Sequence, residues 1–306
     1  MIKNLLYCLL FIFVAQELSA QQDIMMTNFM FDKLRVNPAT TGVEEGFTST
    51  MMYRNQWDKI AGAPNTAIFN AEMNLSKFAV GGAGVSFYHD AIGPIRQNRL
   101  MLNYSYPFQI GEAGIVHAGI GLGMLNFGIE PDFIAPTTNN DASLPKASTG
   151  TNLDANFGVY YKSFKGYYVG LSNTHLNKPT IHSSNYTSER HYFFNVGHKI
   201  VNLLGPKKDV EFQLFVMSDL IKNVGDFNVK YSHANLFYVG LTARTTNTYC
   251  ILAGLYPLKN VTLGYSFDVN ANSILSSKNG THELVIRYRY IAPIPPSEKS
   301  KHPRWL

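Results

Sequence analysis

The side chains best suited to chemistry in this sequence are its histidines, and their spacing forms no recognisable site. They are His89, His117, His175, His182, His191, His198, His233, His282 and His302. No pair has the HExxH or HxH spacing of metal ligands, no G-x-S-x-G nucleophile motif occurs, and Cys250 has no local partner that would activate its thiol. We therefore predict no catalytic residue, no metal and no cofactor. A serine–histidine–carboxylate triad assembled from distant positions, as in phospholipase-type barrels, is left open.

Two glycine-rich stretches invite a phosphate-binding interpretation. "VGGAGVS" at 80–86 and "AGIGLGMLNFG" at 118–128 are each embedded in a strand-like pattern, and no helix follows either of them. A phosphate loop needs the helix N-terminus that comes after it. We therefore interpret these glycines as sites of close strand packing or of bends in a barrel.

Charged and amide side chains recur on one side of several strand-like segments. Those at the alternating polar positions are Arg54, Gln56, Glu72, Arg99, Glu283, Arg287 and Arg289. Acidic and basic residues are close to balance in the chain, with 21 Asp and Glu against 26 Lys and Arg. We expect these side chains to fill an interior with ion pairs, although a substrate-lined channel is the alternative; no nucleic-acid partner is predicted.

The elements that must position these side chains are strands. In "TNLDANFGVYYK" the apolar set Leu153, Ala155, Phe157, Val159 and Tyr161 alternates with a polar set, and "RQNRLMLNYSYPF" and "THELVIRYRY" show the same period of two. About fourteen candidate strands follow, at 47–57, 65–76, 78–90, 95–108, 113–129, 151–163, 166–174, 189–200, 209–218, 225–233, 235–244, 248–256, 260–269 and 280–291.

The connections between these strands sort by position along the chain. The fifth (130–150), seventh (175–188) and thirteenth (270–279) are the longest, and all three are odd-numbered. An even-stranded barrel with both ends in the periplasm places its odd connections outside the cell, where they are free to be long. A soluble β-sandwich has no reason to sort its loops in this way. We predict an all-β, transmembrane antiparallel β-barrel in the lipid bilayer of a Gram-negative outer membrane.

Four segments are expected along the chain. Residues 1–20 combine Lys3 with a short apolar run and small residues at Ser19 and Ala20, which is typical of a secretory signal peptide. Residues 21–46, which contain Asn37 and Pro38, are apolar but irregular and are expected to enter the barrel as a plug. Residues 47–291 form the barrel, and the Pro-rich basic residues 292–306 form a periplasmic tail whose Trp305 could anchor a partner.

The stretch "YRNQWDKIAGAPNT" at 53–66 is expected to divide between two faces. Alternation places Tyr53 and Trp57 outward, in an aromatic girdle at the membrane interface together with Tyr288 and Tyr290 of the last strand. Arg54 and Gln56 then point inward, where we expect them near Arg287 and Arg289 across the seam between the first and last strands. Contact with a partner would come through the following turn, at Asp58, Lys59, Gly62 and Pro64.

Four stretches together resemble the PorP/SprF family of type IX secretion system outer-membrane proteins. They are "NPATTG" at 37–42, "YRNQWDKIAGAPNT" at 53–66, "GYSFDV" at 264–269 and "GTHELVIRYRY" at 280–290, and the likeness runs from about Gln21 to Tyr290. The resemblance implies a FadL-like barrel of fourteen strands, without catalysis. It implies partners as well: a cognate secreted adhesin, such as a gliding adhesin, or its C-terminal domain, and type IX components in the periplasm. A FadL-like diffusion channel for small hydrophobic molecules is the alternative function.

Overall fold

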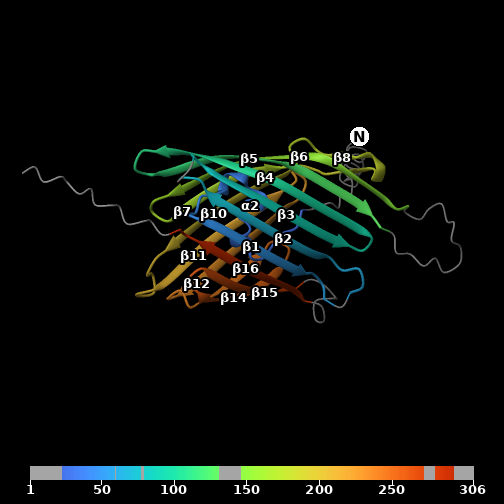
Figure 1. The fold of residues 1–306 in the computed structure, drawn as a ribbon. Coiled ribbons are helices and arrows are strands. Elements are labelled where there is room, and N and C mark those ends of the chain that lie inside the picture. The colour runs from blue at the N-terminus through green and yellow to red at the C-terminus, as the bar shows by residue number, and fades with distance from the viewer. Residues whose placement is uncertain (1–22, 59, 77–78, 131–145, 272–279, 293–306) are drawn as a thin grey trace, which may run out of the picture.

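The computed structural model describes residues 23–58, 60–76, 79–130, 146–271 and 280–292. Fourteen antiparallel strands close into one barrel, in which the first strand pairs with the last (Figure 1). The predicted class, a FadL-like antiparallel barrel, is confirmed. The barrel strands are β1 (Phe47–Asn55), β2 (Asn65–Asn74), β3 (Gly82–Ile92), β4 (Ile95–Ile110), β5 (Gly114–Ile129), β6 (Ser148–Ser163), β7 (Tyr167–Thr174), β10 (His191–Ile200), β11 (Lys208–Ser218), β12 (Asn223–His233), β13 (Phe237–Arg244), β14 (Thr248–Leu258), β15 (Val261–Asn270) and β16 (Thr281–Tyr290).

The two faces of the barrel wall carry the reverse of a soluble protein's burial pattern. On β4, Leu100 and Leu102 are 49% and 66% exposed, whereas Arg99 and Asn103, which flank them, are only 2% and 5% exposed. Apolar side chains therefore cover the outside, and charged and amide side chains line the inside. A bilayer is the surrounding in which this arrangement is stable, because lipid accepts the apolar face and strand closure satisfies the backbone.

The strand ends that the longest connections join all lie at one end of the barrel. The ranges 56–64, 130–147, 175–190 and 271–280 join strands at the end opposite Phe47 and Tyr290, which we call the extracellular end. The connection at 175–190 holds a small hairpin of β8 (Thr180–Ile181) and β9 (Tyr186–Thr187) and the turn η3 (His182–Ser184), which the sequence pattern did not predict. At the periplasmic end, which holds Phe47 and Tyr290, the connections are short.

A segment of residues 23–46, here called the inner segment, lies inside the ring of strands (Figure 1). It contains η1 (Phe29–Phe31), α2 (Lys33–Val36) and η2 (Pro38–Thr40). Its apolar side chains pack on the inner wall: Met25 and Phe29 join Phe193 and Phe215, and the Phe29 and Phe215 rings stack with centroids 5.1 Å apart. No helix in the described residues is long and apolar enough to cross a membrane.

Glycines allow the "NPATTG" part of the inner segment to touch the wall. A Cβ at Gly119 of β5 would collide with the backbone nitrogen of Ala39, and a Cβ at Gly158 of β6 would collide with the Asn37 side chain. Gly82 of β3 approaches the backbone oxygen of Thr41 in the same way. Glycines of β3 and β5 thus let the inner segment approach the wall, whereas the sequence pattern predicts close strand packing or bends at these positions.

Candidate functional site: the barrel lumen

A buried ion cluster lies in the lumen at the seam where β1 meets β16, close to the extracellular ends of both strands. Arg54 lies directly opposite Glu283 in the strand register, and its Nη1 is 3.0 Å from Glu283 Oε2. Its Nη2 is 2.9 Å from Asp268 Oδ2 on β15, and these three side chains are at most 5% exposed. Full burial of two carboxylates is possible here because the guanidinium and several hydrogen-bond donors face them.

The inner segment completes this cluster with backbone amides. The backbone N–H groups of Thr27 and Asn28 donate to the two oxygens of Glu283, at 2.9 and 2.8 Å. The Thr27 hydroxyl donates to Asp268 at 2.7 Å. A carboxylate from the last strand therefore holds the start of the inner segment against the barrel seam.

The expected position of Arg54 near Arg287 and Arg289 is wrong. The register places Thr50 opposite Arg287 and Thr48 opposite Arg289, so Arg54 lies further along β1 towards the extracellular end. Arg287 and Arg289 instead bind Glu44 of the inner segment, at 2.9 and 3.2 Å. Burial opposes ionisation of Glu44, but these two arginines outweigh it and lower the pKa of this carboxyl to about 2.

Glu72, the lumen residue predicted on β2, also contacts the inner segment. Glu72 accepts a hydrogen bond from the backbone N–H of Gly42 at 2.8 Å. Asn37 caps η2, because its side-chain oxygen accepts a hydrogen bond from the Ala39 N–H, and its side-chain NH₂ group donates to the Val159 carbonyl of β6. Pro38 takes the first position of η2, where no backbone N–H is needed. The inner segment is thus fixed at several points along the lumen, by Glu72 of β2 and by Glu283, Arg287 and Arg289 of β16.

A second buried cluster near the extracellular end was missed by sequence reasoning as a unit. Arg99 Nη1 lies 3.1 Å from His175 Nε2, and His175 Nδ1 lies 2.9 Å from Asp154 Oδ2. His175 follows β7 in a left-handed conformation with φ of 56°, so strand alternation gives no signal for its position. His175 and Asp154 resemble two of the three members of a catalytic triad, but the Arg99 guanidinium stands where a serine nucleophile would have to be.

A cavity of about 480 Å³ opens at the extracellular end. Arg54, Gln56 and Trp57 line it from the first strand and its turn, together with Arg244 and Asp268 from the opposite side of the seam. Asp268 is shared with the buried ion cluster. This cavity therefore connects the buried ion cluster with the outside of the cell.

The expected place of Trp57 in the outward girdle is corrected by this cavity. β1 ends at Asn55, because the Gln56 N–H turns to the Pro64 carbonyl and the Trp57 N–H donates to Thr281 Oγ1. Trp57 itself is in a left-handed conformation with φ of 58°, which breaks the alternation. Tyr53, Tyr288 and Tyr290 do lie on the outward face, each between 39% and 49% exposed.

The turn after Trp57 is tied to its neighbours by backbone hydrogen bonds. The Asp58 N–H donates to the Gly280 carbonyl at 3.1 Å, and the Gly93 N–H donates to the Gly62 carbonyl at 2.9 Å. Gly62 has φ of 74°, a value that favours glycine. Lys59 and Trp305, two other predicted partner-contact residues, lie outside the described residues.

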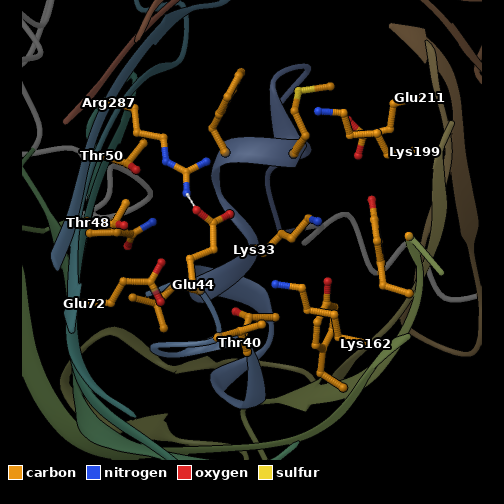
Figure 2. Close-up of a pocket in the computed structure, with 18 of the residues that line it drawn as sticks. Lys33, Thr40, Glu44, Thr48, Thr50, Glu72, Lys162, Lys199, Glu211 and Arg287 are labelled. Carbon is orange, nitrogen blue, oxygen red and sulfur yellow. Dashed lines mark hydrogen bonds and ion pairs between the residues drawn. The ribbon is translucent and has the colours of Figure 1, made fainter. Parts of the chain in front are cut away.

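A second cavity lies at the periplasmic end, between the inner segment and the wall (Figure 2). It measures about 330 Å³ and is lined by the cations Lys33, Lys162, Lys199, Lys230 and Arg287 and by the carboxylates Glu44, Glu72 and Glu211. Burial lowers the pKa of Lys33 to about 8, while Glu211 and Glu44 oppose that decrease. We call this space the periplasmic chamber.

The lumen offers binding groups rather than reactive ones. Among the residues that the structure describes, no group of three or more His, Cys, Asp or Glu side chains could hold a metal ion. Cys250 is buried on the inner wall, within 3.8 Å of the Thr27 hydroxyl. What the geometry provides is a set of charged cavities at both ends of a packed interior.

Comparisons with known proteins agree with this architecture. A family model described as "Type IX secretion system membrane protein PorP/SprF" matches residues 18–288. Among solved structures, the outer membrane protein Omp33 of Acinetobacter baumannii is similar at 10% identity with a TM-score of 0.50, over 82% of this chain and 100% of that one. The CymD monoaromatic hydrocarbon channel is similar at 10% identity with a TM-score of 0.52, over 85% and 93%. No curated protein matches.

Proposed function

Because the chain belongs to the PorP/SprF family of type IX secretion system membrane proteins, we propose that this outer-membrane barrel assists export or surface attachment of one cognate cell-surface protein. A gliding adhesin, or its C-terminal domain, is the kind of partner we have in mind. The family is one of secretion-system barrels and not of enzymes, so the proposed work is recognition of a partner.

The observation that carries this proposal is the ion-paired packing of the lumen. The inner segment is held by Glu283, Glu72, Arg287 and Arg289, and the wall around it is charged. A diffusion channel for small hydrophobic molecules needs an apolar path, and paired, buried charges inside the lumen oppose one. We infer that the inner segment acts as a plug and that the extracellular cavity and the turn from Asp58 to Pro64 face the partner.

The two ends of the chain complete the proposal. Residues 1–20 would direct export and be removed, and residues 292–306 would dock on type IX components in the periplasm. Charge supports the second assignment, since that tail holds Lys299, Lys301 and Arg304 against one acid, Glu298.

The test is deletion of the gene followed by mass spectrometry of proteins released from the cell surface. Loss of one adhesin with other type IX cargo intact supports a dedicated export partner. Loss of all type IX cargo points to a core component of the secretion machine. An unchanged set of surface proteins contradicts both the dedicated role and the core role. Complementation with the wild-type gene, which should restore the surface proteins, is the control.

A further inference from the structure

The periplasmic chamber holds more positive than negative charge within itself. Its lining has five cationic and three acidic side chains. Three of the cations are paired: Arg287 with Glu44, Lys230 with Glu211, and Lys199 with Asp209, which lies outside the lining, each at 2.9 Å. The two that remain are Lys33 of the inner segment and Lys162 of β6.

These two lysines have no carboxylate within ion-pair distance in the described part of the chain. The Lys33 ammonium lies over the Tyr168 ring, 3.6 Å from its centroid, which stabilises the charge without using its hydrogen-bond donors. Lys162 is exposed and faces the lumen, because it shares the parity of the buried Asp154, Asn156 and Tyr160 on β6. Figure 2 shows both side chains reaching into the chamber.

The remaining lining resembles a binding surface for a polypeptide more than a site for a bare anion. Thr48, Thr50 and Ser163 add hydroxyl groups to the lining, while Met30, Leu34 and Val43 provide apolar surface and Tyr167 an aromatic ring. Small-molecule and peptide sites combine an apolar lining with a few placed polar groups in this way. Inorganic phosphate is bound most specifically by backbone N–H groups and bidentate arginines, whereas the chamber's one arginine is already paired and its two unpaired cations are lysines.

The chamber is accessible from the periplasm. Its rim includes Gly166 in the turn between β6 and β7 and Lys199 near the end of β10, both exposed at the end that holds Tyr290. A ligand can therefore enter from the periplasmic side without displacing the inner segment.

We propose that the periplasmic chamber binds an acidic segment of a periplasmic or exported polypeptide, whose carboxylates pair with Lys33 and Lys162 and whose apolar side chains contact Met30, Leu34 and Val43. The proposal rests on the proposed function, since it assigns to the partner a segment that reaches the barrel from the periplasm. The partner would then touch the barrel at two separate places, the periplasmic chamber and the extracellular cavity.

The test measures binding of a short fluorescent peptide of alternating glutamate and valine to the full mature protein in detergent, by fluorescence anisotropy. The variant is Lys33→Gln combined with Lys162→Gln. The matched control is Lys165→Gln combined with Lys259→Gln, which removes the same charge from exposed turns at the same end but outside the chamber. We expect binding about tenfold weaker in the first variant, since two partly exposed ion pairs are lost, and unchanged binding in the control.

Three further measurements make the result decisive. The peptide with glutamine in place of glutamate should not bind, and Lys33→Arg with Lys162→Arg should restore affinity for the acidic peptide. Equal affinity of wild type and the double glutamine variant, measured on protein that keeps its heat-dependent gel mobility, overturns the proposal. Binding of inorganic phosphate without binding of the peptide overturns the assignment to a polypeptide.

Failure of this proposal is distinguishable from failure of the proposed function. If gene deletion removes an adhesin but the double variant binds the peptide normally, only the chamber assignment is lost. If gene deletion leaves the surface proteins unchanged, the export role is lost, whereas a charge-dependent peptide affinity remains as measured.

Discussion

Arg54 is the residue on which the buried ion cluster depends. It is the guanidinium partner of both Asp268 and Glu283, which are 3% and 0% exposed. Replacing Arg54 by Gln leaves two buried carboxylates without a cation. We expect a loss of about 3–5 kcal/mol in the free energy of unfolding, because breaking a buried pair leaves an uncompensated charge. Urea-induced unfolding in lipid vesicles measures it.

The control for Arg54 is an ion pair in solvent. Lys178 and Glu189 lie 2.6 Å apart with side chains 45% and 41% exposed. Lys178→Gln should change stability by less than about 1 kcal/mol, because water screens an exposed pair. Equal effects of the two substitutions would show that the Arg54 cluster contributes no more than a surface contact.

Lys33 carries its charge at a cost that depends on pH. Its pKa is about 8 in the folded protein against about 10.5 for an ordinary lysine, chiefly because burial disfavours the ammonium. Between those pH values the unfolded chain binds more protons, so the contribution of Lys33 to stability is unfavourable below pH 8 and becomes less so as pH rises to about 10.5. The charged groups that act on it are Glu44, Glu211, Lys230 and Arg287.

Lys33→Met should therefore stabilise the barrel at pH 7, by an amount on the order of 1 kcal/mol after loss of the contact with Tyr168. The gain over wild type should shrink between pH 8 and pH 10, because wild type itself loses the buried charge there. Urea unfolding of wild type and variant at pH 7 and at pH 10 measures the difference in their free energies of unfolding. A variant that is less stable than wild type by the same amount at pH 7 and at pH 10 would contradict this account.

At the scale of elements, the contact of η2 with the wall depends on the missing side chain of Gly119. A methyl group at this position would collide with the backbone of Pro38 and Ala39, which cannot move as a flexible side chain would. Gly119→Ala should cost about 1–3 kcal/mol, the usual range for overpacking. Gly128→Ala on the same strand is the control, since its Cβ would meet atoms only at 3.4 Å or beyond and should be tolerated. The measurement is the temperature at which half of the protein shifts its gel mobility on heating. Equal midpoint temperatures for the two variants would argue against a tight contact at Gly119.

The strands themselves were predictable because lipid and lumen impose opposite demands on neighbouring residues. Leu153 and Phe157 outside and Asp154 and Asn156 inside alternate without interruption, so period two identified β6 and its faces. Prediction failed where the backbone leaves that period. Trp57 is the clearest case. Its φ is positive, and its N–H donates to the hydroxyl of Thr281, which lies far along the chain and which no local pattern identifies as a partner.

At the scale of the whole molecule, the sequence predicted which charged residues face the lumen but not which partners they bind there. That Arg54, Arg99 and Glu283 would be buried among charges followed from alternation. Their partners depend on the register between β1 and β16 and on the path of the inner segment, and no local pattern encodes either. The Asp154–His175–Arg99 cluster joins three distant parts of the chain and illustrates the same limit.

The packed interior predicts how the whole barrel conducts. Because the inner segment lies between the extracellular cavity and the periplasmic chamber and is fixed at Glu283, we expect the reconstituted protein to show no stable ion conductance in planar bilayers. A variant lacking residues 24–43 should conduct, provided that its heat-dependent gel mobility shows a folded barrel. Conductance by the wild type would favour the diffusion-channel alternative or an inner segment that leaves the lumen.

Cross-linking separates those two explanations. Thr27 lies 3.8 Å, oxygen to sulfur, from the native Cys250, so Thr27→Cys brings two thiols within reach of a disulfide. If wild-type conductance came from movement of the inner segment, oxidation of this variant should abolish it and reduction should restore it. Thr27→Cys combined with Cys250→Ser is the control that cannot cross-link. Conductance that persists in the oxidised form would mean a path through the lumen beside a fixed inner segment, which contradicts the packing described for its centre.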